Sequence, residues 1–171
     1  MPVSFRCIRV INVIEMKMLQ TVRIFTGTIL LIFTGDVLAD EMMNLPMGLL
    51  IEAVEPYAIN CDPKPELEHA QELFLNKEDA QHTTKCLRRC LMDQFELFKD
   101  GGTQVNSGKL VGYMLLAYPD KMEELNEISN GCNEQNEEMG IDEKCEVAHV
   151  FGMCMLKEMQ SREYEIPKVV Q

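Results

Sequence analysis

Hydrophobic residues along most of the chain recur at intervals of three and four positions, which is the spacing of one face of an α-helix. No stretch alternates hydrophobic and polar residues for long enough to form a sheet. The pattern therefore predicts an all-α fold with six helices, of which the third is the longest. The predicted helices cover residues 49–57, 62–76, 78–99, 107–118, 120–132 and 142–159.

The sixth predicted helix differs from the others because positions 147–156 are apolar on almost every side. A helix without a polar face is buried all round, so we expect it to run through the middle of the fold. Before it, Asn133–Glu146 reads as a polar, acidic connection. After it, Pro167 argues against helix in the tail from Gln160 to Gln171.

The first 39 residues have the profile of a signal peptide. Basic residues precede an apolar run at 24–33, and Val37–Ala39 offers the small residues of a cleavage site. Ten apolar residues are too few to span a bilayer. We expect cleavage after Ala39, with translation from Met18 giving the best fit and 1–17 an atypical extension. The mature domain would be 40–171, with a C-terminal tail at 156–171.

The negative net charge of the chain argues against polyanionic binding partners. Sixteen Lys and Arg against 28 Asp and Glu give a net charge of -12. Removing residues 1–39 leaves 12 bases and 26 acids, so the mature charge is -14. This is the wrong sign for binding phosphate backbones or anionic lipid surfaces. We therefore expect no nucleic-acid partner and no stable membrane insertion.

The cysteines indicate disulfides. Cleavage removes Cys7 and leaves six, an even number in an oxidising compartment, where cystines are favoured over the alternative of six reduced core thiols. Cys86 and Cys90 share one helix face, whereas Cys145 and Cys154 lie on opposite sides of the last helix. The last helix should therefore be joined to two separate elements. Six cysteines allow fifteen connectivities, and this geometry does not choose among them.

The spacing C-x24-C-x3-C-x41-C-x12-C-x8-C, with KCLRRCLMDQF and CEVAHVFGMC around its tightest intervals, resembles the insect odorant-binding proteins of the pheromone and general odorant-binding family. The resemblance extends from Leu45 to about Met155. It implies a six-helix, disulfide-stapled bundle around an internal hydrophobic cavity. It also implies the cystine pairs Cys61–Cys90, Cys86–Cys145 and Cys132–Cys154.

This resemblance implies a secreted carrier of small hydrophobic ligands such as odorants or pheromones, with a membrane chemoreceptor as a further partner. The mature chain keeps ten methionines, whose flexible side chains suit tolerant apolar binding surfaces. Each apolar stripe taken alone also fits an ordinary core. The candidate ligand-binding residues are Leu49, Val54, Phe95, Leu110, Met114, Leu115, Tyr118, Leu125, Val147, Val150, Phe151, Ile166 and Val169.

Catalytic and cofactor chemistry is not expected. The histidines His69, His82 and His149 fall on three different helices and suggest no metal site. A calcium loop centred on Gly140 would place Gln135 among its ligands. No nucleophile elbow, zinc-protease or phosphate-loop motif is present. The alternatives to a carrier are a stapled helical protein that acts through its acidic surface and a saposin-like lipid exchanger, whose cysteine spacing differs.

The tail is expected to act as a pH-sensitive gate, with a loose chain end as the alternative. It carries apolar residues at Ile166 and Val169, while Glu163, Glu165 and the terminal carboxylate offer hydrogen bonds that weaken on protonation. His149 would gain charge near pH 6.5, the ordinary histidine range. We therefore expect acid to favour ligand release.

Overall fold

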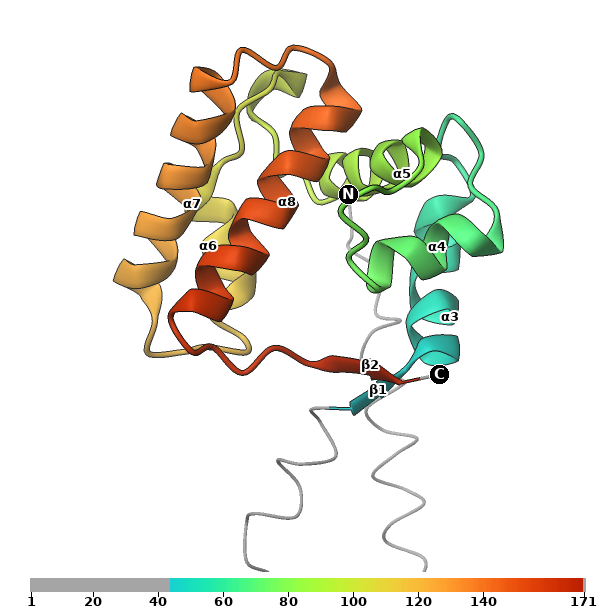
Figure 1. Ribbon diagram of the computed structural model, residues 1–171, viewed down its shortest axis with the longest axis horizontal. Helices are drawn as coiled ribbons and strands as arrows, with labels where there is room; N and C mark the ends of the chain where they lie inside the picture. The colour runs from blue at the N-terminus through green and yellow to red at the C-terminus, as the bar shows by residue number, and fades with distance from the viewer. Residues whose placement is uncertain (1–43, 171) are drawn as a thin grey trace, which may run out of the picture. The chain divides into compact units, whose positions relative to one another are not determined.

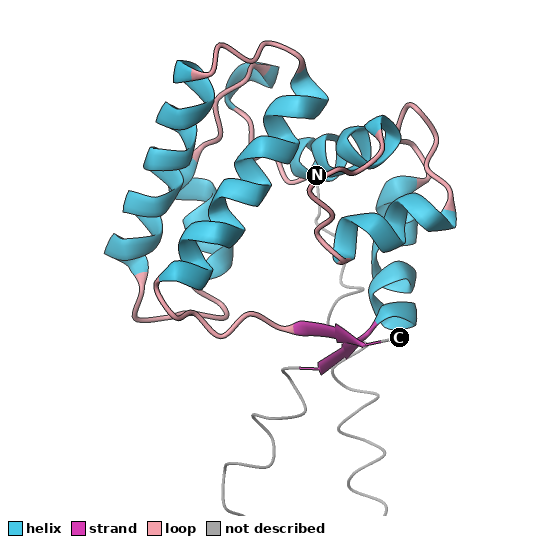
Figure 2. Ribbon diagram, in the orientation of Figure 1, coloured by secondary structure: helices cyan, strands magenta, loops and turns pink. Residues whose placement is uncertain are grey.

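The computed structural model describes residues 44–170, and the expected signal peptide, its alternative start at Met18 and Cys7 lie outside this range. The described residues form six α-helices, one 3₁₀ turn and two short strands (Figures 1 and 2). The all-α prediction of six helices is confirmed. The elements are β1 (Asn44–Pro46), α3 (Met47–Ala58), α4 (Leu67–Phe74), α5 (His82–Gln94), η1 (Lys99–Gly101), α6 (Ser107–Met114), α7 (Met122–Glu138), α8 (Lys144–Ser161) and β2 (Lys168–Val170).

The last helix, α8, is central because it packs against both α5 and α7 (Figure 1). Val147, Phe151 and Met155 on one side of it are buried. Val150 and Met153 on another side are only partly buried. The expectation of burial on every side was therefore wrong, because α8 has neighbours on part of its circumference and a cleft along the rest.

Two separate hydrophobic clusters form the core. The larger one joins α6, α7 and α8 with the segment between α5 and α6, and Leu125, Val105 and Val147 within it are completely buried. The smaller one joins α3, α4 and α5 around Leu87, which is also completely buried. Hydrophobic burial thus divides the helices into two groups that meet along α5 and α8.

Three disulfides connect the helices, and their pairs are those that the family resemblance implies. Two of them hold α8, one to α5 at its beginning and one to α7 beyond its middle. The third links the loop after α3 to α5. The pairs are Cys86–Cys145, Cys132–Cys154 and Cys61–Cys90.

The third helix is shorter than the sequence predicts, and α8, with 18 residues, is longer than the 13-residue α5. A buried carboxylate explains the late start, because Glu72 accepts hydrogen bonds from the backbone N–H of Gln81 at 3.1 Å and the hydroxyl of Thr84 at 2.7 Å. The early end follows from Glu96, whose φ of 51° lies in the left-handed region.

The polar segment after Cys132 was predicted as a connection, but α7 continues through it to Glu138. The side-chain amides of this segment bind the backbone of neighbouring elements. Asn133 exchanges two 2.9 Å hydrogen bonds with the backbone of Val105. Asn136 donates to the carbonyl of Val147 at 3.2 Å. Polar side chains here bind neighbouring backbone, so polarity did not mean a loop.

Side chains cap α6 and α8. Asn106 caps α6 by accepting from the N–H of Lys109, and Glu143 accepts from two N–H groups at the start of α8. Lys121 holds the N-cap position of α7 without a side-chain bond. The second helix was predicted to begin at residue 62, but α4 begins at Leu67, with Glu66 at its N-cap.

The two ends of the described chain meet in a parallel strand pair that the sequence did not predict (Figure 2). Asn44 pairs with Lys168, Leu45 with Val169 and Pro46 with Val170. Each strand has three residues, which is too short for an alternating pattern to be detected. The pair fixes the tail next to the beginning of α3.

Candidate ligand-binding cleft

A cleft of about 1190 Å³ runs along the face of α8 that carries Val150, Met153 and Leu156. The end of α4 and the tail before and within β2 form its other walls, and Figure 1 shows these three elements. Apolar side chains from all three elements line it, among them Phe74, Val150, Met153, Leu156, Ile166 and Val169. The cleft therefore offers a hydrophobic surface assembled from segments far apart in the sequence.

The cleft also has polar and exposed walls. Asn76, Glu78 and His149 lie at the α4 end, while Lys157 and Gln160 are exposed on α8. Such a lining describes a groove that opens to solvent, in contrast to the enclosed apolar cavity that the resemblance implies. The space between α6, α7 and α8, where an enclosed cavity would lie, is filled by the larger hydrophobic cluster.

Three of the candidate ligand-binding residues line this cleft, namely Val150, Ile166 and Val169. The candidates on α6, α7 and the opposite side of α8 lie elsewhere, because they fill or cover the larger cluster. Three of these are buried in it: Leu125, Val147 and Phe151. Four are partly buried against it: Leu110, Met114, Leu115 and Tyr118.

The remaining candidates lie on or near the surface away from the cleft. Leu49 is 61% exposed, and Val54 is partly buried on α3. Phe95 is 41% exposed because α5 ends one residue before it. Its ring packs between those of Tyr57 and Tyr113, at centroid distances of 5.7 and 5.8 Å.

Sequence reasoning missed Phe74, Met153 and Leu156 as lining residues. A signal for two of them was present, since Val150, Met153 and Leu156 recur every three residues and so lie along one strip of α8. The all-round apolar pattern hid this strip by suggesting uniform burial. Phe74 carried no signal, because only the path of the chain after α4 brings it to α8.

His149 links the cleft to the loop after α4. It is buried, and its Nε2 lies 2.9 Å from the carbonyl oxygen of Glu78. Burial lowers the pKa of His149, and the nearby cations Arg88 and Lys85 act in the same direction, while the Glu78 carbonyl and the Glu146 carboxylate oppose them. The neutral form of this histidine is therefore favoured at neutral pH.

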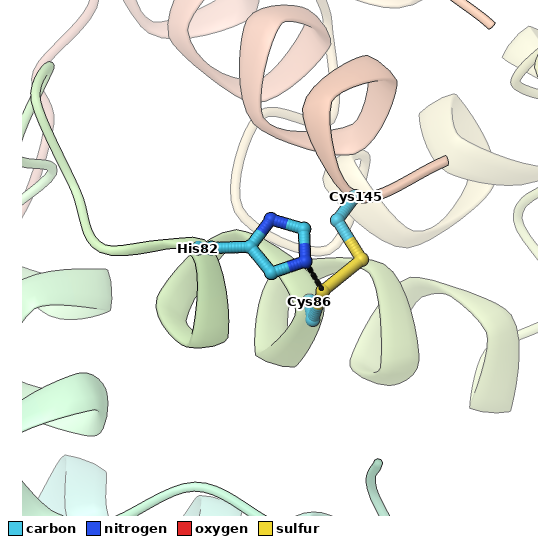
Figure 3. A group of neighbouring side chains, drawn as sticks. All are labelled: His82, Cys86 and Cys145. Atoms are coloured by element: carbon cyan, nitrogen blue, oxygen red, sulfur yellow. Dashed lines mark hydrogen bonds between the residues drawn. A yellow bond between two sulfur atoms is a disulfide. The ribbon is translucent and has the colours of Figure 1, made fainter. Parts of the chain in front are cut away.

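The described residues bring one group of possible metal ligands together, at the junction of α5 and α8. His82, Cys86 and Cys145 have ligand atoms within 4.8 Å of one another, and the Nε2 of His82 lies 3.4 Å from the Sγ of Cys86 (Figure 3). The two sulfur atoms are joined as a disulfide, whereas metal coordination requires thiolates. The group serves as a crosslink between helices.

The tail is held at the cleft by backbone contacts. Besides the pairing of β1 and β2, the hydroxyl of Tyr118 donates to the carbonyl oxygen of Glu165 at 2.9 Å. Among residues 44–170, the carboxylates of Glu163 and Glu165 form no hydrogen bond that holds the tail, and the terminal carboxylate lies outside the described residues.

A model of the PBP/GOBP family matches residues 50–158, which is more than half of the chain. The chain belongs to the PBP/GOBP family. This is a family of secreted binding and carrier proteins rather than of enzymes. The segment matched includes the six cysteines that form the disulfides and most of the cleft, but not its tail wall.

Among solved structures, the odorant-binding protein dmelOBP28a from Drosophila melanogaster is similar to this PBP/GOBP chain, with 19% sequence identity and a TM-score of 0.47. The match covers 75% of this chain and 96% of the Drosophila protein. We find no significant match among curated proteins. Within the described residues, no helix has the length and apolar character needed to cross a membrane.

Proposed function

We propose that the protein is a secreted carrier that binds small hydrophobic molecules, such as odorants or pheromones, in the cleft along α8. The observation that carries the proposal is the joint lining of this cleft by α4, α8 and the tail. Membership of the PBP/GOBP family supports it.

The size and lining of the cleft suit one small molecule. Ligand sites have volumes of about 300 to 1,000 Å³, and the cleft, at about 1190 Å³, is slightly larger than this range. Apolar area removed from water stabilises a complex by about 25 cal/mol per Å². Met153, flexible and polarisable, can adapt to hydrocarbons of different shape.

The disulfides support binding by keeping the walls in place. Cys86–Cys145 and Cys132–Cys154 attach α8 to helices on both sides of it. A wall that is ordered before the ligand arrives loses less conformational entropy on binding.

The tail completes the proposal as a movable wall. Ile166 and Val169 line the cleft from a segment that the three-residue strand β2 and the Tyr118 hydroxyl hold in place. Short edge pairing opens at lower cost than a helix packed in the core. Ligand entry and release would then accompany separation of the tail from β1.

A protein partner, such as a membrane chemoreceptor, is a further part of the proposal. Tyr57, Phe95 and Tyr113 are each more than 40% exposed and form a row of neighbouring rings. Exposed aromatic groups of this kind are typical of contact surfaces.

Displacement of a fluorescent hydrophobic dye by volatile alcohols, esters and fatty acids tests the carrier function. Met153→Trp places a large side chain in the cleft and should weaken dye binding at least tenfold. Leu116→Trp, at a position 87% exposed and outside the cleft lining, is the matched control and should bind like the wild type. Equal binding by all three proteins would place the ligand elsewhere, and no displacement by any compound would favour a surface-acting protein.

A further inference from the structure

An arginine without an anionic partner lies beside the cleft. Arg88 belongs to α5 and crosses over Gly152 of α8, where an added Cβ would come within 2.5 Å of the arginine Nη1. Gly152 therefore provides the space in which the guanidinium group sits. The side chain is partly buried, and its Nε is shielded from water.

The hydrogen bonds of Arg88 leave most of its donors unused. Its Nη2 donates to the Oδ1 of Asn76 at 3.4 Å, a long distance for such a bond, and its Nε has no partner. Among residues 44–170, no carboxylate forms an ion pair with it, and burial lowers its pKa to about 10. A guanidinium carries five donors and is normally paired when it is withdrawn from water.

The neighbouring arginine shows what a paired guanidinium looks like in this fold. Arg89 donates to the carboxylate of Asp93 at 2.7 Å and to the carbonyl oxygens of Gly102 and Gly101 at 2.8 and 3.1 Å. Each of the three guanidinium nitrogens of Arg89 therefore has an acceptor within the protein. Arg88 has no comparable set of acceptors, so protein packing alone does not account for it.

Arg88 is not itself a lining residue, but it lies directly behind the lining at the α4 end of the cleft. Its partner Asn76 lines the cleft, and its charge acts on His149, which lines the cleft as well. The nearest lining acids do not neutralise it: Glu146 is paired with Lys85 at 2.7 Å, and the side chain of Glu78 is exposed. The α4 end therefore has an uncompensated positive charge, while the apolar strip of α8 leads away from it.

We propose that Arg88 anchors the carboxylate of an amphiphilic ligand, a fatty-acid-like molecule whose hydrocarbon chain lies along α8 from Val150 toward the tail. This proposal rests on the proposed function, because it assigns a ligand class to the same cleft. A carboxylate matches the fork of guanidinium donors and forms bonds about twice as strong as those between neutral groups. It would replace the long bond to Asn76.

The length of the cleft agrees with a chain of this kind. The lining residues of α8 run from Glu146 to Gln160, which corresponds to about 21 Å along a helix axis. Ile166 and Val169 close the far part of the apolar wall. An acid bound at Arg88 would thus place its methyl end near the tail.

Dodecanoic acid, dodecanol and methyl dodecanoate form a matched series for the test, with dye displacement at pH 7 as the measurement. Wild-type protein should bind the acid at least tenfold more tightly than the alcohol or the ester. Arg88→Met, which keeps an apolar stem and removes the charge, should lose this preference while its affinity for the alcohol stays the same. Arg88→Lys should restore part of it.

Lys64→Gln removes an exposed cation that does not line the cleft and serves as the control for net charge. It should keep the full preference for the acid. Circular dichroism establishes that each variant is folded. Equal affinity of the wild type for acid and alcohol would overturn the anchor and leave the carrier function standing. Equal losses for all three compounds in Arg88→Met would also overturn it, and failure of every compound to bind the wild type would overturn both proposals.

Discussion

At the scale of single residues, Glu72 shows how one buried side chain sets the course of the backbone. It is 8% exposed and accepts hydrogen bonds from Thr84, Gln81 and Lys77. These bonds, led by the Thr84 hydroxyl, lower the pKa of Glu72 to about 2. The carboxylate thereby joins α4 to the start of α5 and fixes the loop that carries Asn76 and Glu78.

Replacing Glu72 by Gln should lower the free energy of unfolding at pH 7 and reduce its dependence on pH. A carboxyl group with a depressed pKa stabilises the fold above its unfolded value near 4.5, and this stability is lost as the pH falls toward 2. Urea unfolding between pH 7 and pH 3 measures the effect. Glu68→Gln, at an exposed neighbour on α4, is the control, and a similar pH slope in all three proteins would contradict the assignment.

Gly152 carries the second residue-scale prediction. It lies in the apolar stretch of α8, where a side chain would meet Arg88. Gly152→Leu should destabilise the protein by about 1 to 3 kcal/mol, the usual effect of overpacking. Thermal unfolding and dye binding provide the measurements.

Gly131 offers the matched control, because an added Cβ at this α7 position meets nothing within 4 Å. Gly131→Ala should leave the fold intact and raise its stability by about 0.4 to 1 kcal/mol. A Gly152→Leu protein as stable as the wild type would mean that Arg88 moves aside freely.

At the scale of elements, the number and type of the helices could be predicted from the sequence, whereas their ends could not. Hydrophobic spacing reports burial on a helix face, and it located all six helices. The ends depend on contacts from elsewhere: Glu72 delays α5, and Asn133 bonds to Val105 within a helix that was predicted to have ended. Such tertiary contacts leave no local pattern.

The candidate site was harder to predict than the helices for the same reason. A period of three or four residues marks apolar faces but does not distinguish a face that packs on another helix from one that borders a cleft. Phe151 and Val150 are adjacent and equally apolar, yet Phe151 fills the core and Val150 lines the cleft. Only the positions of neighbouring elements separate them.

Deletion of residues 163–171 tests the tail as an element. It removes Ile166, Val169 and the whole of β2, so ligand affinity at pH 7 should fall. Because backbone bonds rather than carboxylates hold the described tail, its removal should lower the affinity at pH 5 by about the same factor as at pH 7. Dye displacement at both pH values, with full-length protein alongside, measures this. A truncated protein that keeps the whole difference in affinity between pH 7 and pH 5 would place the pH response elsewhere, whereas loss of this difference would place it in the tail.

His149 is then the next group to test. Its lowered pKa means that the neutral ring stabilises the fold above the ordinary value of 6.5, and that this stability is lost as the pH falls below it. His149→Gln in the full-length protein should therefore flatten both the stability and the affinity between pH 7 and pH 5. An unchanged pH profile would exclude the histidine as the sensor.

At the scale of the whole molecule, a disulfide connects helices that belong to two different hydrophobic clusters. The two hydrophobic clusters meet along α5 and α8, and Cys86–Cys145 crosses this boundary. The number of cystines could be predicted from secretion and an even count. The pairing came from the resemblance to a family, because helix geometry excluded few of the fifteen connectivities.

Protein that begins at Asp40 should contain no reactive thiol. All six cysteines of the described chain are paired, and Cys61 and Cys132 are buried as well. Titration with a thiol reagent, first without and then with denaturant, should give no reaction in either condition. A reactive sulfhydryl in the native protein would contradict the disulfide framework, and a reduced and alkylated sample provides the positive control.

The pairing of β1 with β2 brings the first and last described residues of the domain into register, with Asn44 beside Lys168. The two ends of the described backbone are therefore neighbours, and the place where they meet, at β1 and β2, forms part of one wall of the cleft. In a circular permutant, a short linker would join the old ends and new ends would be opened at Gly101–Gly102. This protein would keep every disulfide, but β1 and β2 would be covalently connected. If the ligand leaves when β1 and β2 separate, the permutant should have a much slower dissociation rate than the natural chain, with nearly the same affinity.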